Sequence, residues 1–216
     1  MHNQTAQDRR PARAEQERSV RDGILMDRIA GGDEAALAEL YGCYAGPAFS
    51  LAYRVLGDAS AAEEALQDTF MRLWAARSRY DRERGTVATW LLTIAHRRAI
   101  DGLRQRRRHA QALSGEEPAA RELIDRAPLP EERSLLSEQA AAVRAALGRL
   151  PAGERQALEL AFFQGLTQRE IALALSEPEG TVKARMRRGM QRLKLLLERP
   201  APESASEKPV PALRLA

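Results

Sequence analysis

Residues 167–197 constrain the fold of this chain most, because they have the pattern of two helices joined by a tight turn. Thr167 and Glu170 form a T-x-x-E capping box, in which each side chain satisfies a backbone N–H of the other residue. Three apolar residues then share one face at helical spacing: Ile171, Ala172 and Leu175. Pro178 and Gly180 end that helix, and a proline fits well in the first turn of a new one.

The second of these helices is strongly cationic. Residues 183–194 hold six basic residues and no acid: Lys183, Arg185, Arg187, Arg188, Arg192 and Lys194. Its apolar stripe is predicted to contain Val182, Met186, either Met190 or Leu193, and Leu197. A short helix that braces a longer cationic helix is an arrangement that the major groove of DNA accommodates. A surface hairpin with a solvated basic face is the alternative.

Charge and composition extend this prediction to the whole chain of 216 residues. The net charge is only +4, but residues 97–108 form a second basic cluster, with six Arg and one Asp. Two separate basic clusters indicate a long polyanion that is held at two places. Aromatic residues make up 5% of the chain, and Ala, Leu, Arg and Glu dominate, which favours helices over sheets. We therefore expect an all-α fold.

Shifts in composition divide this expected fold into two small helical domains on a flexible linker. We expect a disordered arm at 1–22, a first helical domain at 23–110, an acidic linker at 111–133, a helix-turn-helix domain at 134–198 and a disordered tail at 199–216. The linker holds Pro118, Pro128 and Pro130 and loses helical periodicity. The arm and the tail have few large apolar residues.

Within the first domain the pattern predicts four helical segments. Asp33 caps the first, which Gly46 and Pro47 interrupt before it continues to Gly57. Asp58 or Ser60 starts the next, and the fourth helical segment of the domain follows Thr86. The residues expected to face inward are Ala62, Leu66, Phe70 (or Thr69) and Leu73, then Trp90, Leu91, Ile94 and Ile100.

Several classes of protein lack support in the sequence. Cys43 is the single cysteine, so no internal disulfide can form, and with His2, His96 and His109 it makes no metal-binding pattern. No apolar run approaches the roughly 20 residues of a membrane span, and no signal-peptide core is present. We expect a cytoplasmic protein without a metal or cofactor.

Three blocks, in this order, resemble the bacterial sigma-70 family of RNA polymerase sigma factors, in its small extracytoplasmic-function (ECF) subgroup. Residues 62–74 are similar to the helix that binds core polymerase, and residues 89–101 to the reader of the −10 promoter element. Residues 150–185 are similar to the reader of the −35 element. The resemblance implies a non-catalytic, dissociable subunit that brings polymerase to promoters and opens them. It also implies an anti-sigma factor as a partner.

The resemblance assigns three sets of contact residues. Core polymerase, through its β and β′ subunits, is expected to meet Glu64, Gln67, Asp68 and Phe70. The −10 DNA, read on the non-template strand, is expected to meet His96, Arg97, Arg98, Asp101 and Arg104. The −35 duplex is expected to meet Thr181, Lys183, Arg185 and Arg188, with the two arginines reading guanine and the other two holding phosphate.

Three positions depart from the usual pattern of the family. Arg97 stands where Asn is usual, Ser176 replaces a Gly in the turn, and Glu177 stands where an apolar residue is common. The acidic linker is expected to act through the polymerase, since its charge repels DNA. Two other functions compete with the sigma-factor hypothesis. A dimeric regulator would need a sensing domain, and a helical nuclease would need paired carboxylates; neither is visible in the sequence.

Overall fold

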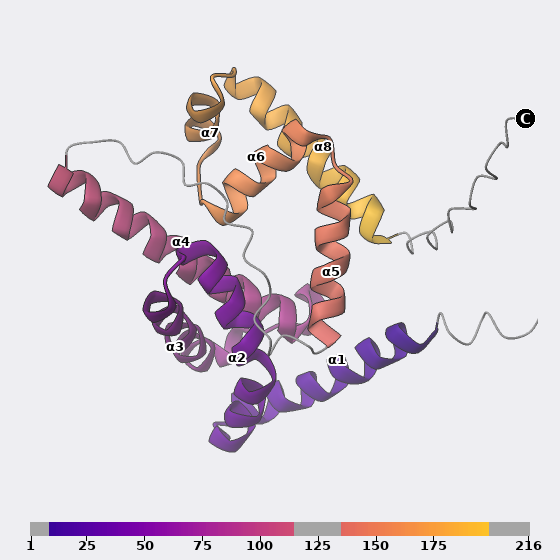
Figure 1. Ribbon diagram of the computed structural model, residues 1–216. Coiled ribbons are helices and arrows are strands. Elements are labelled where there is room, and N and C mark those ends of the chain that lie inside the picture. Colours follow the sequence, from indigo (N-terminus) through magenta and orange to yellow (C-terminus); the bar gives the residue numbers. More distant parts are fainter. Residues whose placement is uncertain (1–8, 115–134, 199–216) are drawn as a thin grey trace, which may run out of the picture.

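The computed structural model describes residues 9–114 and 135–198, with side chains described in 16–112 and 141–198 (Figure 1). Eight α-helices and two short 3-10 turns follow one another in this part of the chain. They are α1 (Arg9–Ala30), α2 (Glu34–Leu56), α3 (Ala59–Ala75), η1 (Arg77–Arg79), η2 (Arg82–Arg84), α4 (Val87–Ser114), α5 (Leu135–Gly148), α6 (Ala152–Phe163), α7 (Gln168–Leu175) and α8 (Glu179–Glu198). No strand forms within these ranges, so the all-α prediction is confirmed. The predicted linker lies almost wholly outside them.

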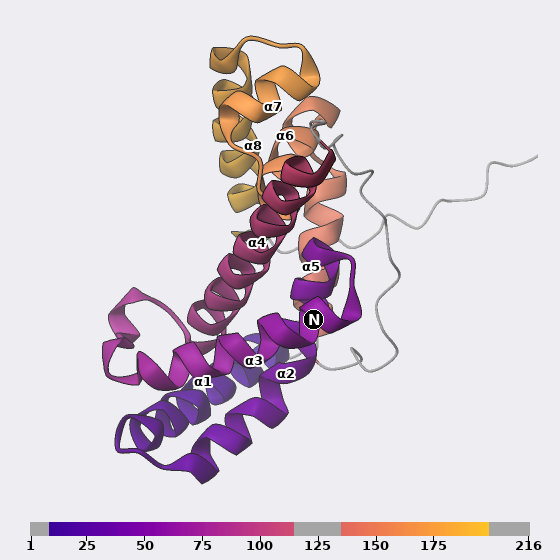
Figure 2. The same ribbon diagram turned by 90° about the vertical axis from the view of Figure 1, so that its left-hand side faces the viewer.

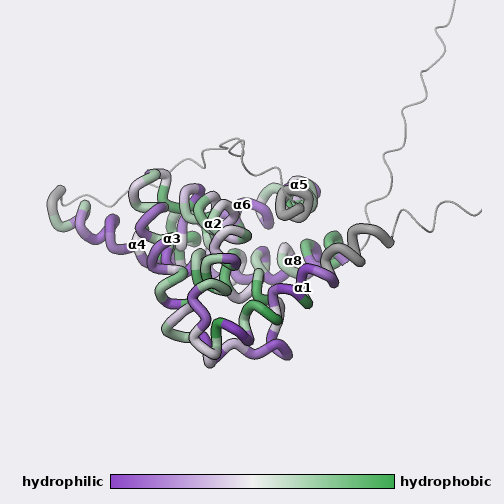
Figure 3. Tube along the Cα trace, turned by 90° about the horizontal axis from the view of Figure 1, so that it is seen from below, coloured by the Kyte–Doolittle hydropathy of each residue, from purple (hydrophilic) through white to green (hydrophobic). Residues whose placement is uncertain are grey.

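Helices α1 to α4 pack around a shared apolar core. The residues predicted to face inward from α3 are all buried, and Leu91 and Ile100 of α4 are buried with them. Trp90 and Ile94 are half-buried against the same core. Asp33 and Asp58 cap α2 and α3 through the backbone N–H groups of Ala36 and Ala61. Figure 3 shows that the C-terminal half of α4 is hydrophilic along most of its length.

The structure corrects two expectations about the first domain. Residues 9–22 were predicted to be disordered, but α1 begins at Arg9. Good helix formers extend the helix beyond the segment that is anchored in the core by Leu25, Met26 and Ile29. The interruption predicted at Pro47 is also wrong, because α2 continues through it. Burial of one continuous apolar stripe on α2 offsets the lost backbone hydrogen bond.

Helices α5 to α8 form a second group, which lies above α1–α3 in Figures 1 and 2 while α4 runs between the two. The capping box of Thr167 and Glu170 is confirmed at the start of α7. Ile171, Val182 and Leu160 form the centre of this group's core. On α8, Met190 is exposed and Leu193 is half-buried, which settles the alternative left open by the sequence. Leu197 is exposed, so its predicted place on the apolar stripe is wrong.

The segment between α6 and α7 packs directly against the first group. Phe163 lies in the apolar cluster of α2, α3 and α4, and the guanidinium of Arg54 stands 4.4 Å above its ring centroid. Arg104 donates a hydrogen bond to the carbonyl of Gly165 at 3.0 Å. Gly165 has φ +62°, and an added Cβ would lie 2.9 Å from Ile100 Cγ2, so only glycine fits this approach.

Candidate nucleic-acid and protein interface

The exposed face of α3 carries a small polar and apolar patch. Glu64 and Gln67 are exposed, as the sequence predicted, and Met71 follows Gln67 by one helical turn with 69% of its surface exposed. Phe70 is only 6% exposed, and its ring packs on Tyr41 with centroids 4.8 Å apart. Phe70 is therefore a core residue, and its prediction as a surface contact is wrong. Met71, the next residue of the helix, is the apolar side chain that is exposed on this face.

Asp68, also on α3, is bound to α4. Its carboxylate accepts a hydrogen bond from Arg98 Nη2, and Arg98 Nη1 lies 3.6 Å from Asp101. The Arg98 side chain is 24% exposed, and its Nε is buried without a partner. Asp68, Arg98 and Asp101, all three predicted as contact residues, thus form one ion-pair network that connects α3 to α4. An open groove of about 590 Å³ runs beside it, between these two helices.

One face of α4 carries exposed cations. Arg97 and Arg108 are exposed, and neither makes an ion pair or hydrogen bond within residues 16–112 and 141–198. Arg104 lies between them on the same face, because the three residues follow at helical spacing. Arg108 belongs to the basic cluster seen in the sequence, although it was not among the selected −10 contacts. These cations stand where they can hold the phosphates of a nucleic-acid strand.

The flank of this face touches the second group of helices. The His96 and Phe162 rings stack at 15° with centroids 4.0 Å apart. His96 Nε2 lies 2.7 Å from the carbonyl oxygen of Phe162, so the nitrogen donates this hydrogen bond. Together with the bond from Arg104 to Gly165, these contacts occupy two of the five predicted −10 residues. No pattern in the sequence predicts this contact.

Carboxylates hold two of the arginines predicted to read the −35 element. Arg185 Nη1 lies 2.7 Å from Glu177 Oε1, and both side chains are 27% exposed. Arg188 Nε lies 3.4 Å from Glu154 Oε1, and Arg192 Nη1 lies 2.9 Å from the same oxygen. Glu154 stands in the first turn of α6, where the helix dipole favours a negative charge, and is 5% exposed.

The N-terminal half of α8 nevertheless presents free cations to solvent. Lys183 and Arg187 are exposed, and neither makes an ion pair or hydrogen bond within the described residues. Thr181 is half-buried in the first turn of the helix. Arg187 is one of the six basic residues seen in the sequence of this helix, but no contact was predicted for it. Its exposure depends on how α6 and α7 pack, which spacing alone does not show.

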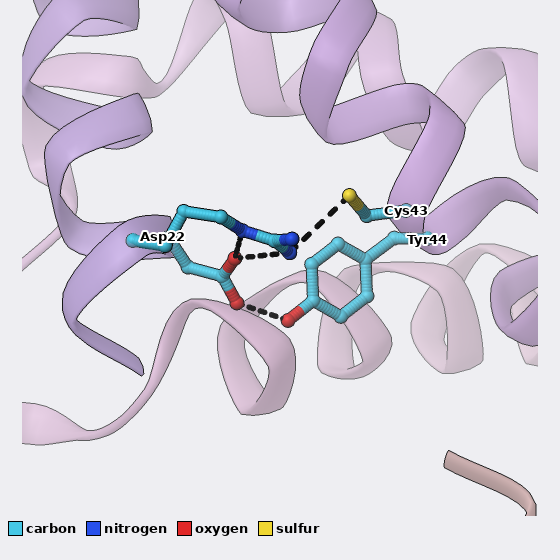
Figure 4. A network of polar contacts seen from close by, with 4 residues as sticks. Asp22, Cys43 and Tyr44 are labelled. Atoms are coloured by element: carbon cyan, nitrogen blue, oxygen red, sulfur yellow. Dashed lines mark hydrogen bonds and ion pairs between the residues drawn. The ribbon is translucent and has the colours of Figure 1, made fainter. Parts of the chain in front are cut away.

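A buried polar network joins α1 to α2 (Figure 4). The Tyr44 hydroxyl donates a hydrogen bond to Asp22 Oδ2, and Arg21 Nη2 lies 3.1 Å from Asp22 Oδ1 and 3.3 Å from Cys43 Sγ. Burial raises the pKa of the Tyr44 hydroxyl, and the hydrogen bond to Asp22 raises it further. Asp22 is 3% exposed and Tyr44 is 1% exposed, so this network holds the helices together and does not face a partner.

Within the described residues no group of three or more His, Cys, Asp and Glu side chains is placed to hold a metal ion. None of the described helices combines the length and apolar character needed to cross a membrane.

Comparison with known proteins decides the family. The family model for sigma-70 region 2 matches residues 40–109, and the one for sigma-70 region 4 matches residues 140–193. The ECF RNA polymerase sigma factor SigK of Mycobacterium tuberculosis is 34% identical over 179 residues, which cover 81% of this chain and 92% of that protein. The chain belongs to the ECF subgroup of the sigma-70 family. The SigK of Mycobacterium sp. strain KMS is 32% identical over 176 residues, covering 79% of this chain and 88% of that protein.

Solved structures give weaker likenesses. Rhodobacter sphaeroides SigE in complex with the anti-sigma ChrR is 32% identical, covers 80% of this chain and 95% of its own, and has a TM-score of 0.39. CnrH in complex with the cytosolic domain of CnrY is 25% identical, covers 82% of this chain and 97% of its own, and has a TM-score of 0.36.

Membership of the family settles the general function. This sigma factor is a non-catalytic subunit that binds core RNA polymerase and promoter DNA and directs initiation of transcription. The competing predictions of a dimeric regulator and a nuclease are therefore set aside. The family models match one block in each helical group, and the contact residues within those blocks remain predictions.

Proposed function

We propose that three surfaces divide the work of this sigma factor: α3 binds core polymerase, α4 binds the −10 element and α8 binds the −35 element. The proposed domain limits are those predicted from composition, with the first domain extended to include α1. The observation that carries the proposal is the placement of the free charges. Exposed cations without a carboxylate partner in the described residues lie on α4 (Arg97, Arg108) and α8 (Lys183, Arg187), whereas the patch of Glu64, Gln67 and Met71 on α3 contains no cation.

The surface for core polymerase consists of Glu64, Gln67 and Met71. An acidic patch in a cationic protein suits a protein partner, because DNA would repel it. Met71 adds a flexible apolar side chain of the kind that adapts to a partner surface. Asp68 lies at the edge of this patch, where it holds Arg98 in place.

The −10 surface is the open face of α4. Arg97 and Arg108 are placed to hold the backbone of a separated strand, and Arg104 joins them when it leaves Gly165. Arg98 supports this face through its ion pairs with Asp68 and Asp101. His96 becomes available only when Phe162 moves away from it.

Binding to both promoter elements requires the two groups of helices to separate. The elements lie about 25 base pairs apart, which is roughly 85 Å of duplex at 3.4 Å per base pair. In the structure Arg104 touches Gly165, and Gly165 belongs to the same group of helices as α8, whose 20 residues span about 30 Å. The closed arrangement is therefore a state of the free protein, and the promoter complex is an open one.

The proposal includes a partner and a location. Members of this subgroup are commonly held inactive by a cognate anti-sigma factor, and we include such a partner for this chain. Family membership also supports a cytoplasmic protein, since promoter DNA and the polymerase meet there. The acidic linker lies outside the described residues, and its predicted action through the polymerase is retained as part of the proposal.

A pull-down with core RNA polymerase tests the proposal. Gln67→Arg and Glu64→Arg are the variants of choice, because both side chains are exposed and make no ion pair within the described residues. Asp68→Arg is unsuitable, since it would set two guanidinium groups against each other at Arg98. We expect both substitutions to weaken core binding at least tenfold, with Arg84→Glu in η2 as a distant charge-reversal control. Unchanged binding by both variants would remove α3 from the polymerase interface.

A further inference from the structure

Four of the six cations in residues 183–194 already hold a carboxylate of this chain. Arg185 binds Glu177, Arg188 and Arg192 share Glu154, and Lys194 lies 3.7 Å from Glu198. Lys183 and Arg187 complete the six, and both are exposed without a partner in the described parts of the chain. The basic surface of α8 is thus much smaller than its sequence indicates.

Arg187 also stands at the centre of the outward face of α8. Val182, Met186 and Gly189 turn inward, toward α6 and α7. The stripe opposite them is formed by residues at successive spacings of 4, 3 and 4: Gly180, Ala184, Arg187 and Gln191. Gly180, Arg187 and Gln191 are exposed and Ala184 is half-buried.

The small residues of this stripe favour a deep approach to DNA. Gly180 and Ala184 precede Arg187 by two turns and one turn, and neither has a side chain long enough to hold the helix away from the base edges. In a helix that lies in the major groove, the centre of the outward face meets the bases and the flanks meet the phosphates. Lys183 lies on a flank, which suits a phosphate contact.

Glu177 and Glu154 hold the other arginines of α8 against the protein, away from DNA. The Arg185 guanidinium rests on Gly153, where an added Cβ would lie 3.0 Å from Cζ, and Glu177 holds its end. Glu154 is 5% exposed, and its Oε2 has no hydrogen-bond partner. If Arg188 or Arg192 moved to a DNA base, the buried Glu154 carboxylate would lose one of its two positive partners. This loss makes a base contact by either arginine unfavourable.

We propose that Arg187 is the specificity-determining arginine of the −35 interface, and that Glu177 is a positioning residue that withholds Arg185 from DNA. The proposal rests on the assignment of α8 to the −35 element. The Arg187 guanidinium takes guanine through O6 and N7, the pair of acceptors that matches its two donors. Arg185 and Arg188 then position α8 within its domain.

The test uses the holoenzyme, formed from the full chain and core polymerase, and a promoter library randomised over the −35 element. Loss of one bidentate contact should reduce discrimination at a single position on the order of ten- to a hundredfold. We expect this effect in Arg187→Ala, a partial effect in Arg187→Lys, and an unchanged base preference in Arg185→Ala. Thermal melting of each variant shows whether it is folded, and exposed Arg187 is expected to tolerate substitution.

Salt dependence tests the role of Glu177. The variant Glu177→Gln releases Arg185, which becomes free to neutralise one more phosphate. The slope of log affinity against log salt for a −35 duplex should therefore steepen by about 0.9, while the base preference is unchanged. Glu177→Asp, which keeps the charge, should retain the wild-type slope. A merely structural role for Glu177 would weaken binding without steepening the slope.

Two results would overturn the proposal. One is a uniform loss of binding to all sequences in Arg187→Ala, which would make Arg187 a phosphate contact. The other is an altered base preference in Arg185→Ala with none in Arg187→Ala. Absence of any −35 preference in the wild-type holoenzyme would instead reject the assignment of α8, and this proposal with it.

Discussion

The imidazole of His96 lies flat on the ring of Phe162, with centroids 4.0 Å apart and an interplanar angle of 15°. These residues belong to α4 and α6, one from each group of helices. With Phe163 half-buried next to them against the first group, they make the two groups one closed body in the free protein.

The first prediction concerns this closed body. Phe163→Ala should open it, because the substitution removes both the packing of the half-buried ring and the cation–π contact with Arg54. We expect the radius of gyration from small-angle X-ray scattering to increase, with unchanged helical content by circular dichroism. Leu173→Ala is the matched control, since Leu173 is 70% exposed. An unchanged radius in Phe163→Ala would show that this contact does not hold the groups together.

The second prediction concerns the network of α1 and α2. Tyr44→Phe removes the donor to Asp22 Oδ2 and leaves part of a buried carboxylate unsatisfied. The free energy of unfolding should fall by about 1–3 kcal/mol, as measured by urea denaturation. Tyr80→Phe should have a smaller effect, because that hydroxyl bonds Gly85 at an exposed site. The double variant Asp22→Leu, Tyr44→Phe should recover much of the loss; failure to recover would show that packing, not the polar pair, is decisive.

The third prediction concerns the stability of the protein at low pH. The backbone N–H of Thr167, followed by its hydroxyl, lowers the pKa of Glu170 below its usual value. A carboxylate with a lowered pKa in the folded state contributes stability above its unfolded pKa of about 4.3, and this contribution is lost as the pH falls further. Glu170→Gln should therefore flatten the acid limb of the curve of stability against pH. The control Glu179→Gln, at an exposed residue of α8, should leave that limb unchanged.

The fourth prediction concerns the close approach of α6 and α8. A Cβ added to Gly189 would lie 2.9 Å from Leu158 Cδ1 and 3.3 Å from Glu154 Cβ. Gly189→Ala should cost about 1–3 kcal/mol of unfolding free energy through overpacking. Gly42→Ala, in the interior of α2 with open space around it, should instead gain about 0.5–1 kcal/mol. Equal effects of the two variants would contradict the crowding inferred here.

Local patterns predicted much of the fold. The capping box of Thr167 and Glu170, the caps at Asp33 and Asp58 and the inward stripe of α3 depend on neighbouring residues, and all are present. The break expected at Pro47 did not occur, because long-range burial outweighs one missing backbone donor. The start of α1 was not predicted for a related reason. The residues that anchor this helix in the core, Leu25, Met26 and Ile29, come after the segment 9–22 that they hold in helical form.

The surfaces were harder to predict than the helices. Phe70 and Met71 differ by one residue, which is 100° around a helix, and only packing shows which of them faces solvent. Arg185, Arg187 and Arg188 are alike in the sequence. They differ in the structure because Glu177 of the turn between α7 and α8 binds Arg185 and Glu154 of α6 binds Arg188, whereas neither reaches Arg187.

The stack of His96 on Phe162 has a consequence for how much of the free protein can bind a promoter. A few contacts across the groups, each of about 1 kcal/mol, give a preference of the order of 2–3 kcal/mol and an open fraction near one molecule in a hundred. Apparent affinity for a promoter falls by that same fraction. The free sigma factor would then bind promoters too weakly to occupy them. Core polymerase would bind the rare open form, and the resulting holoenzyme would occupy the promoter.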